Sequence, residues 1–192
     1  MGSGSIKLYH GTVASSVASI EDGIKLDKGN RYADFGQGFY LTPDYGLAYS
    51  TACFRAKIGK NEEPVIIAFD FDEGAMNSLN WKSFFFPNQE WANFVIANRC
   101  MNDEIRRNVS HNHDGRFDLV IGPVADGKKK SITVVADDVS KGKRELKSVS
   151  ENEIYPAAGD GWGSQWSFHT PKSLSCLKWE AVIYCNRKEG TA

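Results

Sequence analysis

Short apolar runs, separated by polar and glycine-containing segments, dominate the hydrophobic pattern of the chain. Several alternate in polarity or are bounded by turn-forming residues, which is typical of β-strands. The pattern predicts strands over residues 6–10, 39–42, 64–72, 118–124, 132–135, 165–169 and 177–184.

Helices are predicted where a capping residue precedes apolar positions at helical spacing. Such starts occur at Thr12, with an end at Gly23, at Thr42-Pro43, with an end at Gly59, and at Pro87-Asn88 and Thr170-Pro171. Strands outnumber these helices and occur in clusters, which predicts an α+β fold built on a split, mostly antiparallel sheet. We expect one domain over residues 6–192, because the Gly/Ser-rich residues 1–5 look like a cloning remnant.

Composition narrows the class of protein. Of 192 residues, 41% are apolar and 24% are charged, and the net charge of −1 argues against binding nucleic acid through bulk charge. No apolar run reaches the length of a membrane span, and the start lacks a secretory pattern, so we expect a cytoplasmic protein without a membrane partner. The four cysteines form no C-x-x-C pair, which favours reduced thiols and no zinc site.

Three further patterns have alternative interpretations. Residues 111–114, His-Asn-His-Asp, favour a solvated turn over a metal site. The basic runs at 128–130 and 141–144 favour solvated faces over a nucleic-acid contact, because aromatic residues are not interleaved with them. Asp34-Phe35-Gly36 matches a kinase magnesium motif by chance, since the other kinase motifs are missing from the sequence.

Two predicted strand ends carry the candidate chemistry. Residues 8–12 read Leu-Tyr-His-Gly-Thr, and residues 35–42 read Phe-Gly-Gln-Gly-Phe-Tyr-Leu-Thr. Glycine allows a backbone and a ligand to approach closely, and a neighbouring aromatic ring can stack on a flat ligand. The two strand ends, one presenting His10 and the other Tyr40, could therefore hold a dinucleotide between them.

These motifs resemble the ADP-ribosyltransferase superfamily, in the branch of diphtheria toxin and the poly(ADP-ribose) polymerases. The resemblance implies that NAD is bound as the substrate, with no metal. It implies that His10 bonds a ribose hydroxyl of the adenosine half, that the Gly11 backbone pairs with the nicotinamide carboxamide, and that Thr12 supports the adenine-ribose side. Tyr40 would stack on nicotinamide beside Phe39, and His10 and Tyr40 would serve catalysis together with a third residue.

That third residue is Gln165, in the run Gln-Trp-Ser-Phe-His-Thr over residues 165–170. Many superfamily members have Glu there, which bonds the nicotinamide-ribose 2′-hydroxyl and stabilises an oxocarbenium-like transition state. Gln retains the hydrogen bond without the charge, so on charge alone Gln165→Glu should keep or raise activity. A small bacterial group is similar over most of the chain, through motifs that match residues 34–42, 98–99, 122–126 and 165–170.

The resemblance implies a mono-ADP-ribosyltransferase that passes ADP-ribose to a macromolecular acceptor, either protein or nucleic acid. A catalytically silent NAD- or ADP-ribose-binding module and an NAD glycohydrolase are the alternatives. Trp162 lies in the Gly-rich loop before Gln165, where we expect it to contact the acceptor. The toxin-like branch also leaves room for an inhibitory or antitoxin partner.

Overall fold

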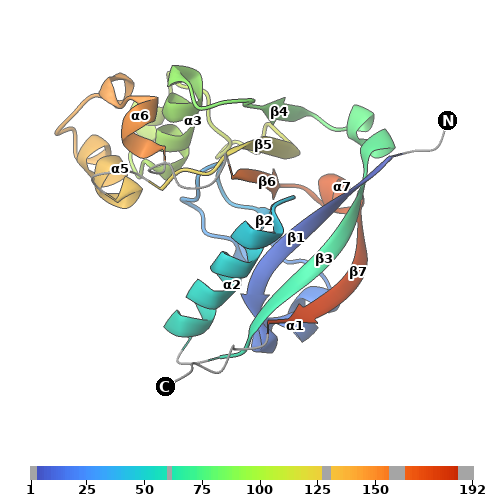
Figure 1. The fold of residues 1–192 in the computed structure, drawn as a ribbon. Helices are drawn as coiled ribbons and strands as arrows, with labels where there is room; N and C mark the ends of the chain where they lie inside the picture. Colours follow the sequence, from blue (N-terminus) through green and yellow to red (C-terminus); the bar gives the residue numbers. More distant parts are fainter. Residues whose placement is uncertain (1–3, 60–61, 127–130, 156–162, 186–192) are drawn as a thin grey trace.

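Two sheets pack face to face at the centre of the fold (Figure 1). The computed structural model describes residues 4–59, 62–126, 131–155 and 163–185. One sheet has the order β1-β3-β7, formed by Ser5–Val13, Pro64–Asp72 and Leu177–Tyr184. The other has the order β2-β6-β5-β4, formed by Phe39–Leu41, Ser164–Phe168, Leu119–Pro123 and Trp81–Ser83. All strand pairs of the described residues are antiparallel except β4 with β5, which confirms the predicted α+β fold.

Helices pack around this pair of sheets. They are α1 (Ala14–Glu21), α2 (Tyr45–Ile58), α3 (Gln89–Arg99), α4 (Asp103–Arg106), α5 (Ile132–Ser140), α6 (Glu151–Ile154) and α7 (Pro171–Leu174). Short 3₁₀ turns span Leu26–Lys28, Glu73–Ser78 and Leu146–Ser148. In the described residues α-helices and strands are equal in number, so the expectation that strands outnumber helices was wrong.

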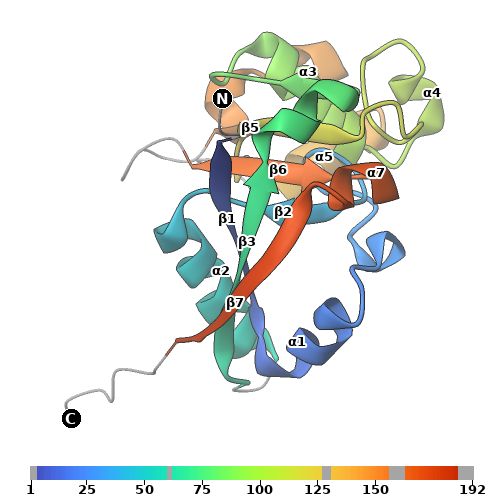
Figure 2. The same ribbon diagram turned by 90° about the vertical axis from the view of Figure 1, so that its right-hand side faces the viewer.

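The apolar residues divide into three layers that follow this arrangement. Leu8 and Phe71 of the first sheet meet Trp166 and Phe168 of the second, and these residues form the core between the sheets. Small residues of α2 pack on the outer face of the first sheet, around Ile66. Helices α3, α5 and α6 cover the far face of the second sheet, while α1 and α2 lie on opposite sides of the first (Figure 2).

Besides the core between them, the two sheets are linked among the described residues by one short backbone junction between β1 and β2. Tyr9 and Thr42 form an isolated antiparallel bridge, with N–H to C=O distances of 2.8 and 3.0 Å. Strand β1 continues beyond this bridge to Val13, whereas β2 runs in the other direction. After Tyr9, the residues of β1 stay paired with β3 on one edge. On the other edge, no further backbone bridge to β2 is present among the described residues.

Several sequence predictions hold. The strands at 64–72 and 177–184 have the predicted bounds. Asn88 caps α3 through the Trp91 N–H, and Thr170 begins α7 with a reciprocal capping box.

The predicted strand at 132–135 is wrong, because these residues begin helix α5. Ser131 caps the helix by accepting a hydrogen bond from the Thr133 N–H. Ile132, Val135, Ala136 and Val139 are buried on one face, at helical spacing. Residues 132–135 are all β-branched and suggest a strand, but the helical spacing of buried positions continues beyond them to Val139.

Two predicted helix starts are also wrong. Thr12 belongs to β1, and Val13 occupies the cap position of α1 without a side-chain hydrogen bond. Helix α2 begins at Tyr45 after Asp44, whose carboxylate accepts from the Leu47 N–H. Thr42 instead forms the junction with β1, and its hydroxyl accepts from the Asp44 N–H.

Candidate functional site

A cavity of about 590 Å³ is lined by residues of both sheets, and its size is in the usual range for small-molecule sites. His10 and Thr12 of β1, Phe39 and Tyr40 of β2, and Gln165 of β6 line it. The rest of the wall comes from α1, the loop that follows α1, Arg55 of α2 and Arg99 at the end of α3. Three strands that are distant in sequence thus bring the predicted catalytic residues to one cavity.

His10 is buried, and its protonation state follows from its surroundings. Burial, reinforced by the positive charge of Arg55, lowers the pKa of His10 to about 4, so the ring is neutral at pH 7. Nδ1 lies 2.8 Å from the Tyr40 carbonyl, which can only accept, so Nδ1 carries the proton. Nε2 is then an acceptor, suited to a ligand hydroxyl, and Phe39 stacks on the ring at 4.4 Å between centroids.

The Tyr40 ring is held by its own hydroxyl. That hydroxyl donates to the Gly36 carbonyl at 2.7 Å and accepts from the Phe35 N–H at 3.0 Å. Gly36 has a φ of +90°, a conformation that favours glycine and shapes the loop around the hydroxyl. Burial raises the pKa of Tyr40, so it stays protonated. Tyr40 therefore offers the cavity a fixed ring rather than an acid or a base.

Gly11 presents its backbone at the free edge of β1. The backbone groups of Tyr9 bond to Thr42 on one edge, and the Ala14 N–H bonds to Glu63 on the other. Bonding direction alternates along a strand, so the N–H and C=O of Gly11 face the same edge as those of Tyr9, beyond the junction. A Cβ at Gly11 would lie 2.1 Å from the Ala48 carbonyl oxygen, so only glycine lets α2 pack here.

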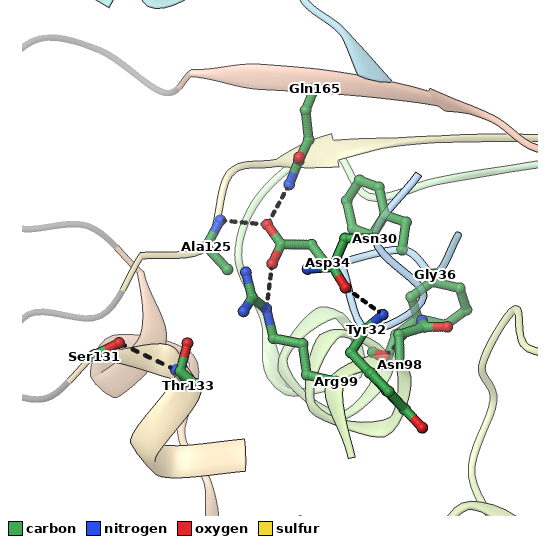
Figure 3. Close-up of polar contacts among 12 residues, drawn as sticks. Asn30, Tyr32, Asp34, Gly36, Asn98, Arg99, Ala125, Ser131, Thr133 and Gln165 are labelled. Carbon is green, nitrogen blue, oxygen red and sulfur yellow. Dashed lines mark hydrogen bonds and ion pairs between the residues drawn. The ribbon is translucent and has the colours of Figure 1, made fainter. Parts of the chain in front are cut away.

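The Gln165 side chain is fixed by a network centred on Asp34 (Figure 3). Gln165 Nε2 donates to Asp34 Oδ2 at 2.7 Å and to the Pro123 carbonyl at 3.2 Å. Arg99 Nε lies 2.6 Å from Asp34 Oδ1, and the Ala125 N–H donates to Asp34 Oδ2. Both hydrogens of the amide are used, so Oε1 is the remaining polar atom of Gln165, which lines the cavity.

Three of the residues that line the cavity are basic. Lys25, Lys28 and Arg55 line the cavity, and none of them has a salt bridge among the described residues. Arg55 keeps part of its side chain in solvent, yet desolvation lowers its pKa. We call Lys25, Lys28 and Arg55 the basic wall. A wall of this charge favours an anionic ligand, although the whole chain is slightly acidic.

Other candidates from the sequence lie elsewhere. Trp162 falls outside the described residues. The 111–114 loop is more than a solvated turn, because Asn112 is buried and His113 Nε2 bonds the Asn98 carbonyl. In the described parts of the chain, no cluster of His, Cys, Asp and Glu could hold a metal, and no helix is long and apolar enough to cross a membrane. All four cysteines are free, as expected.

Comparison with known proteins identifies one family. A family model described as a protein of unknown function (DUF3990) matches residues 6–179. The chain belongs to this family. No curated protein and no solved structure matches the chain.

Sequence reasoning missed the network and the basic wall. Asp34 stands out in the sequence only within a chance kinase match and within a motif of the bacterial group. Lys25, Lys28 and Arg55 occur singly, without a charge run that would mark them. Two motifs shared with the bacterial group could have indicated the network. They are residues 98–99 and 122–126, and they contain Arg99 and Ala125, which both bond Asp34 in the fold.

Proposed function

We propose that this protein is an NAD-dependent mono-ADP-ribosyltransferase that cleaves the nicotinamide–ribose bond and transfers ADP-ribose to a macromolecular acceptor. One observation carries the proposal. A histidine with an acceptor nitrogen, an anchored tyrosine ring and a glutamine with an unused amide oxygen, from three different strands, line a single cavity. These are the groups needed to bind ribose hydroxyls and a flat heterocycle together.

The charge of the cavity supports a dinucleotide over an uncharged nucleoside. Asp34 and Arg99 compensate one another, which leaves the three cations of the basic wall for the ligand. A diphosphate would complement these cations, and charge-assisted hydrogen bonds to phosphate are among the stronger polar contacts in proteins. Gly11 lies between two residues that line the cavity, His10 and Thr12, and its backbone groups at the free edge of β1 suit a carboxamide.

The chemistry follows from this placement. Nicotinamide leaves with the electron pair of the C1′–N bond, and positive charge develops at C1′ of the ribose. In the proposed complex Gln165 Oε1 accepts from the ribose 2′-hydroxyl, and this contact counts most as the charge builds. The acceptor nucleophile then forms the new bond to C1′ and releases its proton to solvent.

A neutral residue at position 165 also favours a second candidate, a silent NAD- or ADP-ribose-binding module. NAD labelled in the adenosine half separates the two when nicotinamide release is followed with and without cell lysate. Release with label on a macromolecule supports transfer. Release with free ADP-ribose alone identifies a glycohydrolase, and binding without release identifies a module. Absence of NAD binding in calorimetry would overturn the assignment of the cavity.

The matched variants make this assay specific to the cavity. His10→Ala and Tyr40→Ala should each weaken NAD binding by about 1–3 kcal/mol, through a lost hydrogen bond and a lost stacking contact. His111→Ala and Tyr49→Ala are controls, because neither residue lines the cavity. Folding of each variant is checked by urea unfolding. Equal losses in the variants and their controls would contradict the site.

A further inference from the structure

The four segments that meet at Asp34 come from distant parts of the chain. Asp34 precedes β2, Arg99 ends α3, Ala125 follows β5 and Gln165 lies in β6. The Asp34 side chain is only 6% exposed, and both of its oxygens have partners. A buried carboxylate with this set of partners fixes the groups around it, because each partner bonds a different position on the two oxygens.

Asp34 also decides which way the Gln165 amide faces. The two partners of the amide, the Asp34 carboxylate and the Pro123 carbonyl, are both acceptors, so both must meet Nε2. Turning the amide over would place Oε1 against two acceptor oxygens and leave both hydrogens unused. The network therefore keeps Oε1 as the acceptor that Gln165 offers to the cavity.

We infer that Asp34 is a positioning residue that orients Gln165 for the proposed NAD cleavage, and that it makes position 165 require an amide instead of a carboxylate. The inference rests on the proposed function for its catalytic meaning. Its structural part, the demand for an amide opposite a carboxylate, stands on the hydrogen bonds alone.

Glutamate at position 165 would conflict with this arrangement. A carboxylate oxygen would replace Nε2, 2.7 Å from Asp34 Oδ2 and 3.2 Å from the Pro123 carbonyl. Arg99 bonds the other oxygen of Asp34 and compensates only one of the two charges. One carboxyl group must take up a proton or the new side chain must rotate away, and either change disturbs the acceptor geometry. This reverses the expectation from charge alone that Gln165→Glu keeps or raises activity.

The test is reciprocal rescue in the full-length protein. Gln165→Glu and Asp34→Asn should each lower kcat for nicotinamide release about 10²-fold with KM within a few-fold. The double variant D34N/Q165E should recover at least about 10-fold over either single variant. In the double variant the introduced asparagine donates to the introduced carboxylate, so the donor and acceptor roles of the two positions are exchanged. Recovery separates positioning from a merely structural role, because any disturbance of the Arg99 and Ala125 contacts is common to Asp34→Asn and the double variant.

A second readout does not depend on activity. Two facing carboxylates raise the pKa of their shared proton in the folded state, so the folded protein binds more protons than the unfolded chain above about pH 4. The urea midpoint of Gln165→Glu should therefore fall as pH rises from about 5 to about 8, relative to the parent and the double variant. Gln89→Glu is the matched control, because Gln89 Nε2 bonds the Val149 carbonyl without a carboxylate partner among the described residues.

The two readouts separate the two proposals. If the parent releases no nicotinamide, the proposed function fails, and the pH dependence still tests the pairing of Asp34 with Gln165. The inference is overturned if the double variant is no better than either single variant while the parent is active. It is equally overturned if Gln165→Glu shows the same pH dependence of stability as Gln89→Glu.

Discussion

Two groups of residues that line the cavity differ in whether their charges are compensated within the protein. Around Gln165, the Asp34 carboxylate is paired with Arg99 and hydrogen-bonded by a backbone N–H and an amide. On the basic wall, Lys25, Lys28 and Arg55 have no salt bridge in the described part of the chain. The charge of the first group is compensated by other residues of the protein, whereas the charges of the basic wall are not compensated by a salt bridge among the described residues.

This difference indicates that the first group serves stability and the basic wall serves ligand binding. A compensated, buried network stabilises one geometry, and removing a member leaves a charge without its partner. Uncompensated cations contribute little to stability, and their charge is available to a ligand. We therefore expect substitutions in the two groups to separate cleanly, with loss of stability in one group and loss of binding in the other.

The largest effect is expected for Asp34→Ala. It leaves the Arg99 guanidinium without its carboxylate and removes a partner from Gln165, so the free energy of unfolding should fall by about 3–5 kcal/mol. Arg55→Gln should change it by less than about 0.5 kcal/mol, since Arg55 has no ion pair within the described residues to lose. Urea unfolding followed by circular dichroism measures both. Equal losses for the two variants would break the comparison.

The next effect is an acid sensitivity located at His10. Its pKa is about 4 in the fold and about 6.5 in an unfolded chain. The unfolded state binds the proton first as pH falls, so stability should drop between about pH 6.5 and about pH 4, by about 3 kcal/mol at the lower end. Desolvation also lowers the pKa of the half-buried His169 to about 4, which adds in the same direction.

Single substitutions test whether His10 is the group that causes this acid sensitivity. Replacing His10 with Asn should remove part of the pH dependence in urea unfolding, while the more exposed His111 should contribute less when it is replaced in the same way. Arg55→Gln should raise the pKa of His10, because the positive charge of Arg55 is, after burial, the second cause that lowers this pKa. An unchanged pH profile in His10→Asn would show that this histidine is not the group that titrates.

The smallest effect concerns ligand affinity. Arg55→Gln should weaken NAD binding about 10-fold, or about 1.4 kcal/mol, through loss of a charged hydrogen-bond donor to a phosphate. Lys57→Gln is the control, since Lys57 lies on the same helix without lining the cavity. The difference between the two variants should shrink at high salt, as measured by calorimetry. A loss for Lys57 equal to that for Arg55 would point to bulk charge instead of a defined wall.

Strands bounded by turn residues were predictable from the sequence, and 64–72 and 177–184 have their expected bounds. Local signals misled where tertiary contacts decide. Residues 132–135 look like a strand until the buried positions at Ala136 and Val139 continue the helix. Thr42 looks like a helix cap, but the junction with Tyr9 takes its backbone and moves the cap to Asp44.

The site divides along the same line. Motifs on strand ends predicted that His10, Tyr40 and Gln165 would belong together, and the fold brings them to one cavity. The roles of Asp34 and Arg99 could not be found in this way, because they depend on a pairing across 65 positions of sequence. A lone charged residue has no local pattern that reveals such a partner, and the same holds for Arg55 on the basic wall.

Gly11 has a consequence for how the cavity can change over evolution or in engineering. It packs against α2, whose Ala48 carbonyl lies too close for any side chain at position 11. Arg55 lies about two turns further along that helix. A larger residue at position 11 would shift the helix and carry the guanidinium with it. Selection for a different anion could therefore act on the packing of α2 against Gly11, away from the residues that would touch the ligand.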